Sequence, residues 1–212
     1  MLLRPVHAQA DAGPLFAASH PPGDEQAIWT YLPDGPYESP ASLQSMLAWA
    51  ERAEDAVYFT LLTLPEERPL GMGAYLRITP EHGVIEIGHI WFARELQRTT
   101  AATEAIYLLT ANAFEVLGNR RLEWKCNALN APSRRAAERF GFTYEGTFRK
   151  HQVLKGRNRD TAWFAITDEQ WPAIRDGFQA WLADANFDAD GRQLRPLGGL
   201  IAEARARRRA KL

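Results

Sequence analysis

The feature that most constrains the fold is a strand-like run that leads through a short loop into a long helix. Residues 84–92 are rich in β-branched and aromatic side chains, and residues 100–117 follow as a helical pattern. One face of that helix is apolar and consists of Ala102, Ile106, Leu109, Ala113 and Val116. Thr99 or Thr100 can cap its start, and Gly118 is placed to end it. An α/β domain is therefore the expected fold class.

Further strands and helices are expected on both sides of this unit. Before it, the patterns predict a strand near residues 2–6, a helix over 11–19, a helix over 39–52 capped by Ser39, and strands over 57–64 and 70–78. Short turns between these strands indicate an antiparallel meander. After it, they predict a strand over 121–127, a helix over 131–140, strands over 142–154 and 161–167, and a helix capped by Asp168.

Length and composition favour one globular domain. The chain has 212 residues, 46% of them hydrophobic, and no apolar run approaches the ~20 residues that a membrane span needs. We therefore expect a soluble domain over residues 1–182 and an extension over 183–212. The single cysteine, Cys126, excludes an internal disulfide, and residues 1–8 lack the apolar core of a secretory signal, so a cytoplasmic location is expected.

The charge balance argues against large polyanionic partners. Lys and Arg number 25 against 26 Asp and Glu, so no global positive field exists to collect nucleic acid or an anionic membrane. Small molecules or proteins are the expected partners. The tail carries a local basic run of Arg205, Arg207, Arg208, Arg209 and Lys211. A solvated helix is its simplest interpretation, and a protein or nucleic-acid contact is the alternative.

The loop before the long helix is a candidate anion-binding site. A strand that passes through a tight loop into a helix aims free backbone N–H groups and the positive end of the helix dipole at one point, which suits a pyrophosphate. The residues at this point are Gln97, Arg98, Thr99, Thr100, Ala101 and Ala102. The small side chains of residues 99–102 let a phosphate approach the main chain, while Arg98 can pair with it and Gln97 can hold the loop. An ordinary capped helix start is the alternative.

A second polar pair stands where the strand 121–127 gives way to the next helix. Asn130 can cap that helix or hydrogen-bond an amide-bearing ligand, and Ser133 lies in its first turn. Cys126 is a rival as a catalytic nucleophile, but no residue near it in sequence forms a Cys-His motif, so a buried structural cysteine is expected.

In this order, the motifs resemble the GNAT superfamily of acetyltransferases, and within it the branch of the ribosomal-protein N-terminal acetyltransferases. The stretches that carry the resemblance are Ile85–Phe92, Leu96–Thr99, Ala102–Ala105, Asn130–Ser133, Gly141–Gly146 and Gly156–Thr161. Their ordered series is more specific than any single motif. The resemblance implies a mixed, mostly antiparallel sheet that is splayed at its central strands and flanked by helices.

The resemblance also implies acetyl-CoA as the acyl donor and assigns residues to it. The pantetheine arm would pair with the backbone near Ile90 and Phe92, and Asn130 would contact the same arm. The diphosphate would bind residues 97–102. One departure affects this loop, because Thr100 stands where the family usually has glycine; its hydroxyl can donate to phosphate in compensation.

The same resemblance suggests an acid and leaves the base open. Ser133 would protonate the leaving thiolate, since Ala137 stands where many members carry a tyrosine acid; water, or a merely structural Ser133, is the alternative. Candidate bases are Glu86, His89 and His151.

Position along the strand separates two of these bases. Glu86 and His89 share the strand 84–92 at odd spacing, so at most one of them faces the acetyl group, and His89 has a structural role as its alternative. Gln152 stands where the ribosomal branch carries a glutamate, so the substrate chemistry of that branch does not carry over securely.

Aromatic residues point to the acceptor side of the reaction. Trp29, Tyr31 and Tyr37 lie where related enzymes build the acceptor wall, and a ring-lined pocket suits an aminoacyl or peptide-like amine. Core packing of Trp29 is the alternative. We expect direct transfer to a primary amine, either a protein N-terminus or an aminoacyl-like compound. A free small-molecule amine, such as an amino acid, polyamine or antibiotic-like compound, is one alternative, and a non-catalytic CoA-binding module is another. A homodimer is compatible with the resemblance, and no metal site is expected.

Overall fold

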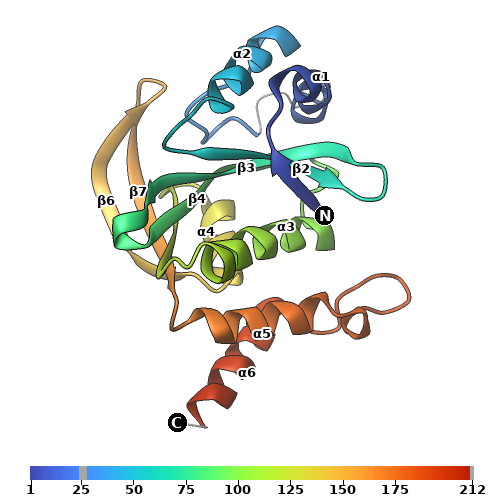
Figure 1. The fold of residues 1–212 in the computed structure, drawn as a ribbon, viewed down its shortest axis with the longest axis vertical. Helices are drawn as coiled ribbons and strands as arrows, with labels where there is room; N and C mark the ends of the chain where they lie inside the picture. The colour runs from blue at the N-terminus through green and yellow to red at the C-terminus, as the bar shows by residue number, and fades with distance from the viewer. Residues whose placement is uncertain (24–27, 211–212) are drawn as a thin grey trace. The chain divides into compact units, whose positions relative to one another are not determined.

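Figure 1 shows the computed structural model, which describes residues 1–23 and 28–210. Seven strands form a sheet in the order β1-β2-β3-β4-β5-β7-β6, and helices flank it. The sheet is mostly antiparallel, so the predicted α/β fold class is confirmed. The chain divides into two compact units. Unit 1 contains residues 1–80, 85–105 and 153–157, and unit 2 contains residues 81–84, 106–152 and 158–212.

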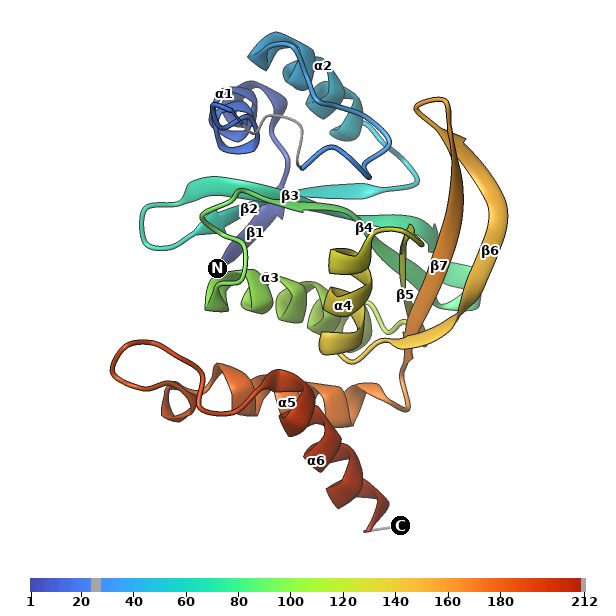
Figure 2. The same ribbon diagram turned by 180° about the vertical axis from the view of Figure 1, so that it is seen from behind.

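Unit 1 combines a strand meander with a pair of helices. Its elements are β1 (Leu2–Pro5), α1 (Ala8–Ser19), α2 (Pro40–Ala50), β2 (Val57–Thr63), β3 (Arg68–Thr79), most of β4 (Val84–Phe92) and the start of α3 (Thr100–Ala111). β2 pairs antiparallel with both β1 and β3, as the predicted meander requires. The helices α1 and α2 lie together on one face of these strands (Figure 2).

The start of α2 follows from its first residues. Ser39 Oγ accepts a hydrogen bond from the N–H of Ser42, and Ser42 Oγ accepts one from the N–H of Ser39, which makes a capping box. The predicted cap is therefore confirmed. The helix then buries Leu43 and Leu47 completely in a core that includes Trp29.

Unit 2 contains the rest of the sheet and the C-terminal helices. Its elements are the end of α3, a π-helical turn (Asn112–Val116), β5 (Arg121–Asn127), α4 (Ala131–Arg139), β6 (Thr143–Leu154), β7 (Arg157–Thr167), α5 (Trp171–Leu182) and α6 (Leu197–Arg209). β5 pairs antiparallel with β7. Every second residue of β5 is buried, namely Leu122, Trp124 and Cys126. β7 begins at Arg157, earlier than predicted.

Two helix predictions need correction. The helix predicted over 100–117 is α-helical to Ala111 and then π-helical. Asp168 does not cap α5, and Gln170 is the N-cap residue. Pro172 accounts for the later start, because proline lacks an N–H and is favoured in the first turn of a helix.

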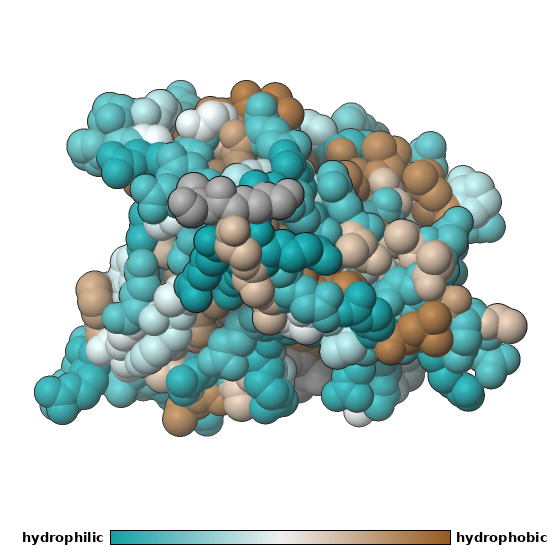
Figure 3. All heavy atoms as spheres, turned by 90° about the horizontal axis from the view of Figure 1, so that it is seen from below, coloured by the Kyte–Doolittle hydropathy of each residue, from teal (hydrophilic) through white to brown (hydrophobic). Residues whose placement is uncertain are grey.

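The prediction of a solvated tail helix is wrong for one face of α6. That face is buried and consists of Leu197, Leu200, Ile201 and Ala204, and α6 packs against α5. Arg205 is half-buried and donates a hydrogen bond to the carbonyl of Gly141 (2.9 Å), whereas Arg208 pairs with Asp176. The side of the molecule seen in Figure 3 is mostly hydrophilic. Lys211 lies outside the described residues.

Within the described residues, no helix is long and apolar enough to span a membrane. The division of the chain into a domain over 1–182 and an extension over 183–212 stays a prediction.

Close packing of α5 on α6 makes Gly177 sensitive to substitution. A Cβ added there would lie 2.5 Å from Ile201 Cγ1 and 2.8 Å from Ile201 Cα. Such distances force backbone movement, so we expect Gly177→Ala to lower the free energy of unfolding by about 1–3 kcal/mol. Gly198→Ala is the matched control, since its Cβ would meet nothing within 4 Å. Urea unfolding followed by tryptophan fluorescence measures both variants, and equal midpoints for the two would contradict this packing.

Candidate functional site

The loop before α3 has the architecture that its sequence predicts. Thr99 Oγ1 accepts a hydrogen bond from the N–H of Ala102 (3.1 Å), so Thr99 caps the helix. Gln97 holds the loop, because its side-chain amide donates to the carbonyl of Phe92 (3.0 Å). That carbonyl belongs to the β4 segment expected to pair with pantetheine. The strand end and the helix start are thus fixed to each other through side chains of unit 1.

Free donors gather at this helix start. Within the described part of the chain, no hydrogen-bond partner is found for the N–H groups of Arg98, Thr100 and Ala101. Arg98 adopts a left-handed backbone conformation (φ 63°), and the side chain of Thr100 is exposed. Unpaired amides at the positive end of a helix dipole are the donors that a diphosphate requires, so these residues fit the phosphates of acetyl-CoA.

Asn130 and Ser133 lie together at the start of α4 in unit 2. Asn130 Oδ1 accepts a hydrogen bond from the N–H of Ser133 (3.1 Å), which confirms the predicted cap. Ser133 Oγ accepts another from Trp124 Nε1 (3.0 Å). The indole occupies a lone pair of this oxygen, and the hydroxyl also hydrogen-bonds with the thiol of Cys126.

Cys126 has the features of a structural thiol. It is 5% exposed, and burial raises the pKa of its thiol, although a hydrogen bond with Ser133 opposes this. A thiol with a raised pKa is protonated near neutral pH and is a poor nucleophile. The geometry therefore supports the interpretation of Cys126 as a structural residue.

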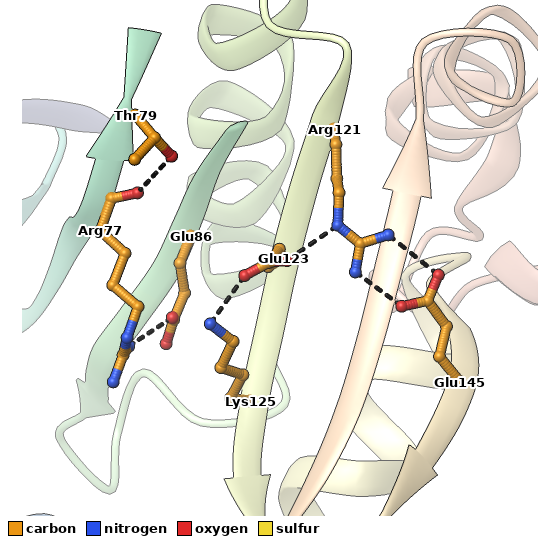
Figure 4. A network of polar contacts seen from close by, with 7 residues as sticks. All are labelled: Arg77, Thr79, Glu86, Arg121, Glu123, Lys125 and Glu145. Carbon is orange, nitrogen blue, oxygen red and sulfur yellow. Dashed lines mark hydrogen bonds and ion pairs between the residues drawn. The ribbon is translucent and has the colours of Figure 1, made fainter. Parts of the chain in front are cut away.

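Glu86 forms an ion pair with Arg77. Its buried carboxylate contacts Arg77 Nη1 at 2.5 Å, and the two side chains point toward one another in Figure 4. A carboxylate neutralised by a guanidinium is a weak candidate for proton abstraction. In unit 2, a second group of ion pairs lies along β5. Glu123 contacts both Arg121 and Lys125 there (Figure 4).

His89 has a different environment. Its side chain is 6% exposed, its backbone is left-handed (φ 49°), and its ring meets the ring of Tyr58 edge-on. Among the residues that the structure describes, Nε2 has no hydrogen-bond partner. Asp34 Oδ1 lies 3.9 Å from Nε2. Burial lowers the pKa of the imidazole, and Asp34 opposes that shift. A neutral imidazole of this kind can accept a proton.

The predicted aromatic wall is only partly exposed. Trp29 is completely buried, as its core alternative requires, and its ring packs edge-on against Tyr37. Tyr31 is 37% exposed. Tyr37 donates its hydroxyl proton to Asp34 Oδ2 (2.6 Å), and burial together with this hydrogen bond raises the pKa of the phenol. The roles of these rings in substrate binding stay predictions.

The structure adds two residues that the sequence patterns missed. Asp34 stands between Pro33 and Gly35, where an aspartate is typical of a turn. Lys155 Nζ, from the β6–β7 turn, donates to the carbonyls of Trp29 (2.8 Å) and Asp34 (3.1 Å). No local signal links residues so far apart in sequence.

His151 makes a hydrogen bond and ring contacts within unit 2. Its Nδ1 shares a hydrogen bond with Thr161 Oγ1 (2.9 Å), and its ring contacts Phe148 and Trp163. This environment favours a structural role for His151. His89 and His151 as bases stay predictions.

Comparisons with known proteins agree on the family. The sequence model of the acetyltransferase (GNAT) domain matches residues 1–143, more than half of the chain. A GCN5-related N-acetyltransferase from Brucella melitensis is 44% identical, and its crystal structure superposes with a TM-score of 0.91 over 94% of this chain and 90% of that one. An uncharacterized N-acetyltransferase, YnaD of Bacillus subtilis strain 168, is 25% identical over 145 residues, which cover 68% of this chain and 82% of YnaD.

A more distant neighbour has a ligand of the expected kind. The structure of Mycobacterium smegmatis RimJ in complex with CoA-disulfide has a TM-score of 0.68 and 22% identity, and it covers 80% of this chain and 83% of RimJ. At this identity the match shows a common fold. With a family match over residues 1–143, the chain belongs to the GNAT acetyltransferase family and is an acetyl-CoA-dependent N-acyltransferase.

Proposed function

We propose that this enzyme acetylates a primary amine by direct attack, with His89 as the base and Ser133 as the acid. The observation that carries the proposal is that the N–H groups of Arg98, Thr100 and Ala101 have no hydrogen-bond partner in residues 1–23 and 28–210, which offers the acyl donor a specific anchor. Acetyl-CoA supplies a thioester carbonyl that an uncharged amine can attack. The residues of the chain bind the donor, take a proton from the amine and return one to the leaving sulfur.

The residue roles divide by chemistry. Residues 97–102 hold the diphosphate, the backbone near Ile90 and Phe92 pairs with the pantetheine arm, and Asn130 contacts the same arm. Asn130 also caps α4, because its side-chain oxygen accepts from the N–H of Ser133. Its contact with the pantetheine arm would therefore use the side-chain NH2 group. These assignments follow the family resemblance, and the cap and loop geometry supports them.

His89 is preferred over Glu86 as the base. The carboxylate of Glu86 pairs with Arg77, whereas His89 Nε2 is buried without a hydrogen-bond partner in the described residues. Burial lowers the pKa of His89, which keeps its ring neutral and ready to accept a proton at neutral pH.

The acceptor is proposed as a class only. An aminoacyl amine or protein N-terminus fits the family branch represented by RimJ, but Gln152 replaces the glutamate of that branch. A free polyamine or amino acid is the second candidate. Acetylation assays with peptides that have a free N-terminus and with small amines, each measured by the release of the CoA thiol, separate the two candidates. Turnover of peptides alone supports the branch, and turnover of small amines alone overturns it.

Ser133→Ala tests the proposed acid. We expect kcat to fall by about 100-fold, the lower range for loss of general acid catalysis, while acetyl-CoA binding is retained. Ser133→Thr is the matched control, because it keeps a hydroxyl that can accept from Trp124 and donate to sulfur. Steady-state thiol release and calorimetric titration measure the two effects. An unchanged kcat in the alanine variant would assign the proton to water instead.

A further inference from the structure

Two buried polar atoms of unit 1 face one another without hydrogen bonds. Asp34 Oδ1 and His89 Nε2 are 3.9 Å apart, and within residues 1–23 and 28–210 neither has a hydrogen-bond partner. A distance of 3.9 Å is too long for a direct hydrogen bond. A buried donor or acceptor left unsatisfied costs about 1–3 kcal/mol, so the pair calls for a third polar group between the two atoms, either a water or a ligand.

The carboxylate of Asp34 is held in place from several directions. Tyr37 donates its hydroxyl proton to Oδ2 (2.6 Å), and Lys155 Nζ donates to the backbone carbonyl of Asp34 (3.1 Å). The same lysine donates to the carbonyl of Trp29, whose ring is fully buried. Gly35 has a left-handed backbone (φ 67°), and a Cβ there would lie 2.4 Å from the Trp29 ring. These contacts fix Oδ1 in its position facing the imidazole.

The geometry selects a group with more than one N–H. A single ligand nitrogen can lie about 2.8 Å from both Oδ1 and Nε2, and the two hydrogen bonds then form an angle of roughly 90° at that nitrogen. A primary ammonium has three protons and can donate to both atoms, whereas a hydroxyl has one proton and a tertiary ammonium has one. A carboxylate accepts only, and a neutral imidazole accepts at its unprotonated nitrogen.

We propose that Asp34 Oδ1 and His89 Nε2 together receive the primary ammonium group of the acceptor. The inference rests on the proposed function and names the substrate class more closely. The acceptor is an amine that is protonated in solution and enters as a cation, so Asp34 is a substrate-binding residue in addition to His89 as the base. Alcohols, which have a single O–H proton, do not match the two acceptors.

The proton balance of the step is complete. The ammonium N–H facing Nε2 transfers its proton to His89, which leaves a neutral amine hydrogen-bonded to Asp34. The nitrogen lone pair forms the C–N bond to the acetyl carbon and the C–S bond breaks. The second amine proton goes to the thiolate sulfur, by way of the proposed acid Ser133, and His89 releases its proton to solvent. The products are the amide, the free thiol of CoA and one proton.

The charged and titratable groups around the imidazole set its response to pH. Asp34 faces it from the loop after residue 28, and Tyr58, whose pKa burial raises to about 12, faces it from β2. Tyr37 and Lys155 contact Asp34. Because the Asp34 charge opposes the lowering of the His89 pKa, its removal lowers that pKa further.

Asp34→Asn and His89→Gln in the full chain test the proposal. The probes are spermidine, alanine amide, a tetrapeptide with a free N-terminus, and N,N-dimethylbenzylamine as the tertiary control. For the primary amines we expect Asp34→Asn to raise KM about 10-fold and to move the acid limb of the kcat/KM profile to lower pH. His89→Gln is expected to lower kcat about 100-fold and to remove that limb. Asp55→Asn removes an exposed carboxylate of the same unit and is expected to match wild type.

The outcomes distinguish a failure of the Asp34 assignment from a failure of the proposed function. An unchanged KM and acid limb in Asp34→Asn, with turnover retained, overturns the role of Asp34 and leaves the proposed function standing. Turnover of none of the primary amines by the wild type, with acetyl-CoA still bound, overturns the proposed function and this inference with it. Calorimetric titration of acetyl-CoA into each variant separates the cases, since neither substitution touches residues 97–102.

Discussion

Thr100→Glu is expected to weaken acetyl-CoA binding by about 100-fold, or about 2.7 kcal/mol, without lowering the stability of the fold. Thr100 is the first residue of α3 and its side chain is exposed, and the N–H groups of Thr100 and Ala101 have no partner among the residues that the structure describes. A glutamate there sets a negative charge beside the amides proposed to bind the diphosphate. Repulsion between like charges at close range, together with loss of these amide contacts, accounts for the expected size of the effect.

The same substitution has the opposite effect on the helix itself. A carboxylate in the first turn interacts favourably with the helix dipole, which contributes roughly 0.3–1 kcal/mol to stability. Affinity and stability are thus expected to change in opposite directions, which general damage to the fold cannot produce. Isothermal titration with acetyl-CoA and thermal unfolding without ligand measure the two quantities.

Thr100→Gln is the control for size. It adds a side chain of the same length as glutamate without the charge, so we expect at most a few-fold loss of affinity. Equal losses in the glutamate and glutamine variants would mean that bulk, rather than charge, obstructs the loop. Full affinity in the glutamate variant would remove residues 97–102 from the diphosphate site.

Local signals explain which parts of the site were predictable. The capping of α3 by Thr99 and of α4 by Asn130 follows from short side chains that bond to amides three residues away. The hydrogen bond from the Gln97 side chain to the Phe92 carbonyl also joins residues that are close in sequence, in the loop before α3. Interactions of this range are encoded within a single window of sequence.

Long-range contacts explain what the sequence did not reveal. Asp34 looks like a turn residue, and its significance depends on Lys155 from a distant hairpin and on a left-handed backbone at His89. Glu86 is a candidate base by residue type, but its carboxylate is paired with Arg77 from β3. Strand periodicity cannot predict the surroundings of Asp34 or the ion pair of Glu86. It indicates which face of a strand a side chain lies on, and not which distant side chains contact it.

A second long-range contact has a large expected effect on stability. Asp11 in α1 is completely buried and accepts hydrogen bonds from Arg4 (2.9 and 2.5 Å), from the N–H of His7 (2.8 Å) and from Thr60 Oγ1 (2.6 Å). It thus joins β1, α1 and β2. Asp11→Ala leaves these donors without their acceptor, and we expect a loss of about 3–5 kcal/mol in the free energy of unfolding. Urea unfolding at pH 7 measures the loss, with the exposed Asp55→Ala as control.

The loss caused by Asp11→Ala should depend on pH in a definite direction. The hydrogen bonds from Arg4, Thr60 and the His7 N–H together outweigh burial and lower the pKa of Asp11. A carboxylate with a lowered folded-state pKa contributes stability that is fully present above its unfolded-state pKa of about 3.9 and is lost as the pH falls through the folded-state value. The gap between wild type and Asp11→Ala should therefore be constant from pH 7 to pH 5 and narrow below about pH 4. A gap that stays constant down to pH 2.5 would mean that the ionised carboxylate does not carry the interaction, and that the shape of the side chain alone holds the strands and α1 together.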